Sequence, residues 1–177
     1  MRLSPVLVDA DLSPAELQAA RLDGEVYDLA GSYCLLGELE TPRHRARAVL
    51  AGRSPRLIAE LGTAAWIWGA VDTLGGLEFA VTPDARARLG PAHHATVREI
   101  VYEPGDVTAL DGCQVTTPLR TVIEFARSEE PFDPTVAYRL AAIGGFSPHD
   151  CLASLESRVG IPSKARGVEN LRRLLTP

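Results

Sequence analysis

The sequence predicts an α+β fold on three observations. Pairs of a small capping residue and a proline, which mark helix starts, recur along the chain. A helix and a hairpin pattern come first, and segments of alternating apolar residues, typical of strands, follow in the middle. The last third has apolar residues at helical spacing. We therefore expect a small N-terminal unit, then a mixed α/β domain with C-terminal helices.

The predicted helix starts share one pattern, a capping residue followed by proline. A capping side chain can accept a hydrogen bond from a free N–H of the first turn, and proline at the first helical position lacks an N–H that would have no partner. The pairs are Ser13-Pro14, Thr41-Pro42, Thr117-Pro118, Asp133-Pro134 and Ser147-Pro148. Glu16 follows Ser13 by three residues, which is the pattern of a capping box.

The remaining elements follow from apolar periodicity and turn residues. In the first half we expect a helix at 14–22, a hairpin turning near Gly31, a helix at 42–52, a short buried strand within 55–61 and a short helix at 62–70. Later come strands within 76–83 and 95–104 joined by 83–94, a strand pair around Asp111-Gly112, a helix at 118–127, and helices within 134–144, 148–159 and 168–175.

The chain's only two tryptophans, Trp66 and Trp68, lie in the stretch GTAAWIWGAVD. On a helix their side chains are about 200° apart, so they cannot form one stacking platform. The small neighbours Ala64 and Ala65 permit another element to approach closely. We expect both indoles in the core where the helix meets the sheet, with a ligand-binding or base-stacking role as the alternative.

Composition narrows the class of protein. Apolar residues make up 46% and charged residues 23%, which is ordinary globular composition. The chain has no apolar run of about 18 residues and no signal-peptide pattern, so we expect a cytoplasmic protein without membrane contact. The cysteines (Cys34, Cys113 and Cys151) are far apart and the histidines lack ligand spacing. We expect mostly buried, reduced thiols, no metal and no cofactor.

Charge changes sign between two neighbouring segments. Residues 1–41 hold eight acids against two arginines, a net charge of −6. Residues 42–60 hold five arginines against one glutamate, a net charge of +4. We expect a domain boundary at this change, near Thr41-Pro42, which divides the chain into 1–41 and 42–177.

Three stretches of the chain are similar to one protein family. They read AAWIWG, then LEFAVTPDARAR, then VREIVYEPGDVTALDGCQVTTPLRTVIEFAR. Together they resemble the AbiEi-type antitoxins and related transcriptional regulators of actinobacteria, over residues 56–128 closely and 8–40 loosely. The positions that carry the last stretch are Asp106, Val107, Thr108, Gly112, Val115, Thr116, Thr117, Pro118, Arg120, Thr121 and Glu124.

The resemblance implies a winged-helix module at 1–41, followed by an α/β antitoxin-like domain. It also implies DNA binding with autorepression in some members, and neutralisation of a nucleotidyltransferase-like toxin protein. Affinity for DNA rests mainly on lysine and arginine side chains that neutralise phosphates. The candidate DNA-contacting residues are Arg21, Arg43, Arg45, Arg47, Arg53 and Arg56. They form either a phosphate-facing patch or a solvated helix face with local ion pairs to the acidic segment.

The predicted wing departs from the family pattern. Positions where relatives carry arginines hold Glu25, Asp28, Ala30 and Ser32. An acidic surface favours a basic protein partner, because complementary charge sets on-rate and specificity. Two functions therefore stay open: a regulator that binds the double-stranded DNA of its own operon, neutralises a toxin, or both; and a protein-interaction module that has lost DNA binding. A homodimer is open in either case.

An enzyme is the remaining alternative. Acidic residues crowd the segment TVIEFARSEEPFD, and two close carboxylates could bind a divalent ion for nuclease chemistry. No P-loop, G-x-S-x-G or H-E-x-x-H motif is present, so we expect no enzymatic activity. Arg120 and Glu124 are spaced to pair on a helix surface, where the Arg120→Ala change would cost about 0.5 kcal/mol. Arg120 is the candidate partner-binding residue.

Overall fold

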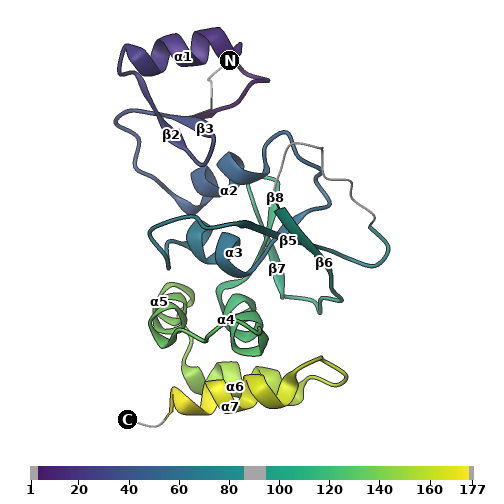
Figure 1. The fold of residues 1–177 in the computed structure, drawn as a ribbon. Helices are drawn as coiled ribbons and strands as arrows, with labels where there is room; N and C mark the ends of the chain where they lie inside the picture. Colours follow the sequence, from purple (N-terminus) through teal and green to yellow (C-terminus); the bar gives the residue numbers. More distant parts are fainter. Residues whose placement is uncertain (1–3, 86–94, 176–177) are drawn as a thin grey trace.

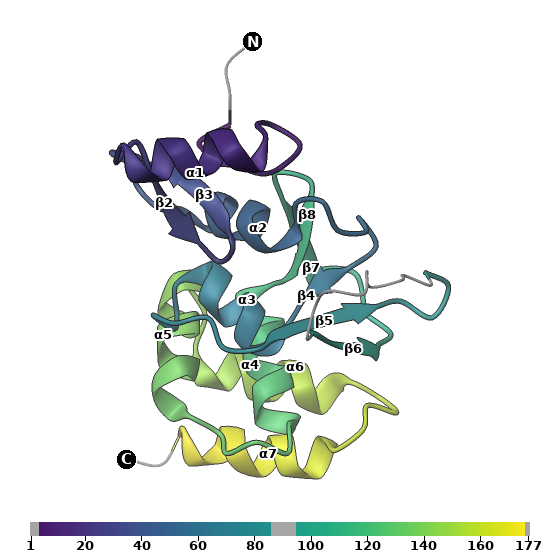
Figure 2. The same ribbon diagram turned by 45° about the horizontal axis from the view of Figure 1, so that its top comes forward.

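The computed structural model describes residues 4–85 and 95–175. Along its length the chain stacks an N-terminal unit of helix and sheet, a central mixed sheet with helices beside it, and a C-terminal group of helices (Figure 1). The same order is seen from a second direction (Figure 2). The predicted α+β class is confirmed.

The N-terminal unit is a small antiparallel sheet between two helices. Its elements are β1 (Val6–Leu7), α1 (Pro14–Leu22), β2 (Val26–Leu29) and β3 (Ser32–Leu35), with strand order β1-β3-β2 in the described residues. Ala30 and Gly31, with φ of 55° and 82°, form the predicted hairpin turn, since a two-residue loop with both φ positive matches the strand twist. Strand β1 was not predicted from the sequence.

The two faces of this sheet pack against different helices. Leu7 and Val26 meet Leu17 of α1, while Val6 and Cys34 face α2 (Pro42–Leu50) and join the central core. Ser32 donates a hydrogen bond to the Ala48 carbonyl at 2.9 Å. Helix α2 therefore covers one face of the first sheet and also contacts the central sheet. The division into domains 1–41 and 42–177 stays a prediction.

The central sheet mixes parallel and antiparallel pairs. Its elements are β4 (Ile58–Ala59), α3 (Leu61–Trp68), β5 (Leu77–Val81), β6 (Ala95–Glu99), β7 (Val107–Leu110) and β8 (Cys113–Thr116). Within the described residues the strand order is β6-β5-β4-β8-β7, with β5–β6 and β4–β8 parallel and the others antiparallel. The predicted strand pair turns at Asp111 and Gly112, both with positive φ. Most of the predicted connection 83–94 lies outside the described residues.

The C-terminal helices pack on the central unit mainly through α4, and α5 also contacts α3. The helices are α4 (Pro118–Arg127), α5 (Pro134–Gly144), α6 (Pro148–Ser157) and α7 (Lys164–Arg173). Their core joins Ile123 of α4, Leu140 of α5, Leu155 of α6 and Leu171 of α7. Helix α7 begins at Lys164, earlier than the predicted 168. No helix in residues 4–85 and 95–175 is long and apolar enough to cross a membrane.

The predicted helix caps are all confirmed. The side chains of Ser13, Thr41, Thr117, Asp133 and Ser147 each accept a hydrogen bond from a backbone N–H of the first turn, with proline next in the chain. The capping box at Ser13 and Glu16 is also present, and hydrogen bonds from Ser13 lower the pKa of the Glu16 carboxyl. These local features could be predicted because each cap and its partner lie within three residues of one another.

The tryptophans lie in the core, as predicted. Trp66 is 5% exposed and packs in the central cluster with Ile67 and Phe79. Trp68 is half-buried at the boundary between the central and helical clusters, and its Nε1 donates a hydrogen bond to the Thr116 carbonyl at 2.8 Å. The cysteines are also free and mostly buried, as predicted, and burial raises the pKa of Cys151 to about 12.

Candidate functional site

The six candidate DNA-contacting arginines come from three parts of the fold and differ in exposure. Arg21 lies on α1, four others lie on or just after α2, and Arg56 lies in the loop before β4. Arg21, Arg43 and Arg56 are exposed, whereas Arg45, Arg47 and Arg53 are only partly exposed. The second group is held by contacts within the chain.

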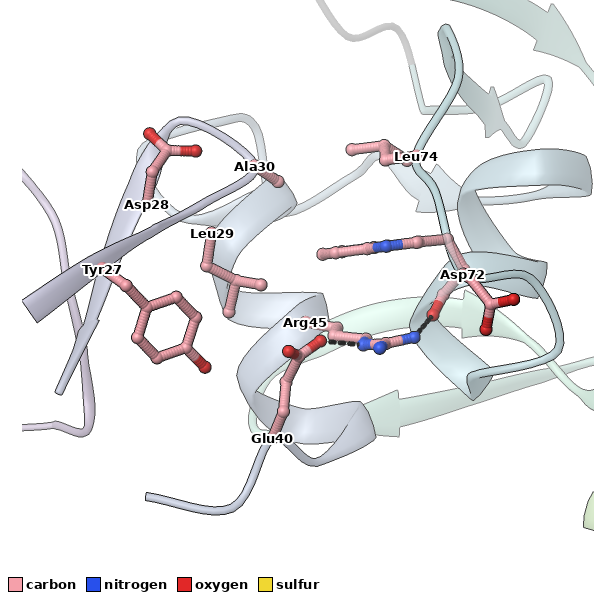
Figure 3. A pocket seen from close by; sticks show the side chains of 9 residues that line it. Tyr27, Asp28, Leu29, Ala30, Glu40, Arg45, Asp72 and Leu74 are labelled. Atoms are coloured by element: carbon pink, nitrogen blue, oxygen red, sulfur yellow. Dashed lines mark hydrogen bonds and ion pairs between the residues drawn. The ribbon is translucent and has the colours of Figure 1, made fainter. Parts of the chain in front are cut away.

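Arg45 is held from three sides. Its Nε donates to the Glu40 carboxylate, and its Nη1 donates to the Trp66 carbonyl at 2.6 Å (Figure 3). The guanidinium also lies over the Trp66 ring, 4.9 Å from the ring centroid. A guanidinium with an ion pair, a carbonyl acceptor and an aromatic face is a structural clamp between α2 and α3.

Arg47 and Arg53 are also bound by groups within the chain. Arg47 donates from Nε to the Val6 carbonyl at 2.9 Å, and from Nη2 to the Asp11 carboxylate at 3.0 Å. Arg53 donates from Nε to the Val49 carbonyl at 2.6 Å, and its guanidinium lies 5.8 Å from the Phe79 ring centroid. The second alternative predicted local ion pairs with the acidic segment, and Arg45 and Arg47 make them; however, the two side chains are only 20% and 27% exposed and do not form a solvated face. DNA binding itself stays a prediction.

The surface of the N-terminal unit is acidic. Its exposed carboxylates are Asp9, Glu16, Asp23, Glu25, Asp28, Glu38 and Glu40. Arg21 is the sole basic residue in the described part of this unit, residues 4–41. Exposed leucines lie among these acids, with Leu22 and Leu39 each 86% exposed and Leu36 60% exposed. Carboxylates around exposed apolar side chains suit a partner that is both basic and apolar.

A pocket of about 270 Å³ opens between β2 and the Arg45 clamp. It is lined by Tyr27, Asp28, Leu29, Ala30, Glu40, Arg45, Trp66, Asp72 and Leu74. Tyr27 and Leu29 project toward Arg45, while Asp28 projects from the other side of the strand (Figure 3). A hydrogen bond with Cys34 raises the pKa of Tyr27 to about 12.

The expected surface pair of Arg120 and Glu124 is a buried pair instead. Nη2 of Arg120 lies 2.6 Å from the Glu124 carboxylate, as the i, i+4 spacing predicted. However, the two side chains are only 2% and 1% exposed. Nη1 of Arg120 donates to Asp106 at 2.8 Å, and the guanidinium lies 5.0 Å from the Tyr102 ring centroid. The surface placement was wrong because helical spacing does not say which face of a helix is covered.

Arg120 belongs to a network that joins the central sheet to the C-terminal helices. Arg158, after α6, donates two hydrogen bonds to Asp106, at 2.9 and 2.6 Å. Arg98 on β6 binds Glu60 with two hydrogen bonds, at 2.6 and 2.5 Å, and also reaches Glu124. Burial is the main cause that raises the pKa of Glu60, and the Glu60 hydrogen bond raises the pKa of Arg98.

This network bears on two predicted roles. The partner-binding role of Arg120 stays a prediction, and its burial means that the side chain could reach a partner only after the network opened. For the nuclease alternative, Glu124 is already bound by Arg98, Arg120 and Arg127. In the part of the chain that the structure describes, no group of three or more His, Cys, Asp or Glu side chains could hold a metal ion.

Arg98, Arg158 and Glu60 were not singled out from the sequence. Arg98 stands in an alternating strand, where a charged residue is ordinarily solvent-facing. Arg158 follows the last turn of α6, and its partner Asp106 is 52 residues earlier in the chain. No local pattern links such distant residues, so only their contacts in the fold, with the buried Asp106 and Glu124 at the centre, identify the network.

The fold and these sites define a chain of the α+β class, with an acidic N-terminal unit and a network of arginine–carboxylate pairs between the central sheet and the C-terminal helices. A distant structural match is the RV2827C protein from Mycobacterium tuberculosis, with a TM-score of 0.46 and 17% sequence identity, covering 97% of this chain and 76% of that one. No protein-family model and no curated protein matches this chain.

Proposed function

We propose that this chain is a non-enzymatic regulator of the antitoxin kind that recognises a basic protein partner through its acidic N-terminal unit. One observation carries the proposal: three of the six arginines expected to contact phosphates, Arg45, Arg47 and Arg53, are bound within the chain, whereas seven of the eight carboxylates of residues 4–41 are exposed. Arg45 and Arg47 each pair with an acid of the first 41 residues. What remains at the surface of the N-terminal unit is a strong excess of negative charge.

The physical argument compares two partners for the same surface. A duplex carries closely spaced phosphates, and binding depends on cations of the protein that replace condensed counterions. Six exposed carboxylates, besides the Glu40 carboxylate that pairs with Arg45, outnumber Arg21, the one basic residue of residues 4–41, and they would oppose that contact. A basic protein is attracted by the same carboxylates, since complementary charge speeds association and excludes wrong partners. The exposed leucines add apolar surface that a protein partner can bury and that phosphates would not contact.

The resemblance to antitoxins supports a particular kind of partner. Neutralisation of a toxin is a protein–protein contact, and it needs no DNA-binding surface. The VTTPLRT segment that carries the resemblance contributes Thr121 and Arg120 to the buried interior. We therefore assign recognition to the N-terminal unit and a scaffold role to the central domain.

Neutralising three exposed carboxylates should weaken partner capture. The variant Asp23→Asn, Glu25→Gln, Glu38→Gln keeps side-chain size and removes charge around Leu22 and Leu36. We expect association with a captured basic protein to slow by about tenfold or more at low salt. Quantitative mass spectrometry of pull-downs at native expression, followed by association kinetics on the purified partner, measures the effect.

A charge-matched variant separates local recognition from general repulsion. Glu99→Gln, Glu129→Gln, Glu130→Gln removes the same charge away from the N-terminal unit and should change association by less than about threefold, because screening limits distant charges. Equal slowing by both variants, or capture of acidic rather than basic proteins, would contradict the proposal.

A further inference from the structure

Helix α1 lies at one end of the molecule, on the outer face of the N-terminal sheet (Figure 1 and Figure 2). Its inner face packs on the sheet through Leu17, which is fully buried beside Leu7 and Val26. Among the nine residues of the helix, Leu17 is the one that is buried. The opposite face of α1 is therefore turned away from the rest of the described chain.

Apolar side chains form a row along that outer face. Ala15, Ala19 and Leu22 are separated by four and three residues, so at about 100° per residue their side chains lie within about 60° of one another. This is the spacing of a face that a helix ordinarily buries. All three residues are nevertheless exposed, Leu22 by 86%. We call these three residues the outer row, and it is left uncovered in the described part of the chain.

The outer row has a shape that fits a second helix. Ala15 and Ala19 are one turn apart, and small side chains at this spacing let the axis of another helix approach closely. The larger Leu22 side chain, at the end of the row, would fill a gap between side chains of that helix. Backbone N–H groups in the middle of α1 are already bonded within the helix. The contact would therefore depend on side-chain packing and not on strand pairing.

Two carboxylates lie beside the outer row. Glu16 and Asp23 are seven residues apart, so they share one flank of the helix, about 80–100° from Ala15, and we call them the acidic flank. Both are exposed, and neither forms an ion pair in the part of the chain that the structure describes. Hydrogen bonds with Ser13 lower the pKa of the Glu16 carboxyl, which favours its charged form. Arg21 lies on the other flank, about 140° from Glu16 around the helix.

We propose that the outer face of α1 is the docking surface for an amphipathic helix of the basic partner, with its apolar side chains on the outer row and its arginines or lysines beside the acidic flank. This inference rests on the proposed function, because it names the element of the partner that binds and the place where it binds. In this mode apolar packing supplies affinity, and complementary charge supplies orientation and preference. An acidic helix would bring like charges together on the flank.

Designed helical peptides are the direct probe. We would label with fluorescein a peptide of leucine, alanine and lysine that has a leucine at every third or fourth position, and titrate it with the full chain by fluorescence anisotropy at about 50 mM salt. One control peptide has glutamate in place of lysine. A second control has the same composition but alternates leucine and lysine, which removes the apolar helix face. We expect the basic amphipathic peptide to bind about tenfold or more tightly than either control.

The chain offers a matched pair of variants for this titration. Leu22 and Leu39 are each 86% exposed, but Leu39 lies between β3 and α2, outside the outer row. Leu22→Ser should weaken binding of the basic peptide by about tenfold, whereas Leu39→Ser should change it by less than about twofold. Both variants should fold, because neither side chain belongs to the core. Equal weakening by the two variants would overturn the docking face and leave the proposed function standing.

A second measurement locates the contact in the wild-type chain. With leucine and alanine methyl groups labelled, the NMR signals of the outer row should shift when the basic peptide is added, and those of Leu39 should not. Binding without shifts in the outer row would overturn the docking face alone. The same holds for self-association of the peptide-free chain that Leu22→Ser abolishes in sedimentation, because a second copy would then cover the row. No preference for the basic over the acidic peptide would overturn both this inference and the proposed function.

Discussion

Replacing Arg120 with alanine is expected to lower the free energy of unfolding by about 3–5 kcal/mol, as measured in urea melts. Removal of this guanidinium leaves the Asp106 and Glu124 carboxylates buried with fewer partners, and it opens space beside Tyr102. Buried charges without full compensation are costly because the interior solvates them poorly. This loss is several times the cost expected for a surface pair.

The chain offers a matched control for that variant. Arg173 pairs with Glu169 four residues away on α7, as Arg120 pairs with Glu124, but both members are 67% exposed. Arg173→Ala should therefore cost less than about 1 kcal/mol. Equal losses for Arg120→Ala and Arg173→Ala would contradict a buried network that holds the C-terminal helices to the sheet.

Replacing Trp66 with alanine should also cost about 3–5 kcal/mol. The indole is covered by the central core and by the Arg45 guanidinium, so its removal creates a large cavity and frees that arginine from the ring. Chemical denaturation monitored by far-UV circular dichroism measures the change without relying on tryptophan emission.

The second tryptophan supplies the comparison. Trp68→Ala removes a half-buried ring and its hydrogen bond to the Thr116 carbonyl, so we expect a smaller loss of about 1–3 kcal/mol. If Trp66→Ala lowers the free energy of unfolding by less than about 1 kcal/mol, the ring is not a core element. That result would favour the ligand-binding alternative for this tryptophan.

Sequence reasoning succeeded where cause and effect lie within a few residues. Ser13 and Glu16 form their capping box locally, and Ala30 and Gly31 turn the hairpin through their own backbone angles. Strand β1 was missed because Val6 and Leu7 are a strand only through pairing with Cys34 and Tyr33, far along the chain. Two residues carry no periodicity, so tertiary pairing alone defines them.

The sites were harder to predict than the fold, for the same reason. The sequence placed Arg43, Arg45 and Arg47 near one another but could not say that Arg45 would bind Glu40 and Trp66. It paired Arg120 with Glu124 correctly and gave the pair the wrong environment. Folding does not change charge composition, so the acidic character of the first 41 residues could be predicted from the sequence. The role of each arginine, by contrast, depends on which distant backbone carbonyl or carboxylate it binds in the folded chain.

The central claim is that the N-terminal unit recognises a basic protein rather than DNA. Fluorescence anisotropy of the DNA upstream of its own gene, titrated with the full chain between about 50 and 200 mM salt, tests it most directly. The account predicts no specific, salt-sensitive binding even at the low end. Steep loss of a specific signal with rising salt would mean that Arg21, Arg43 and Arg56 contact phosphates despite the surrounding acids, and it would contradict the account.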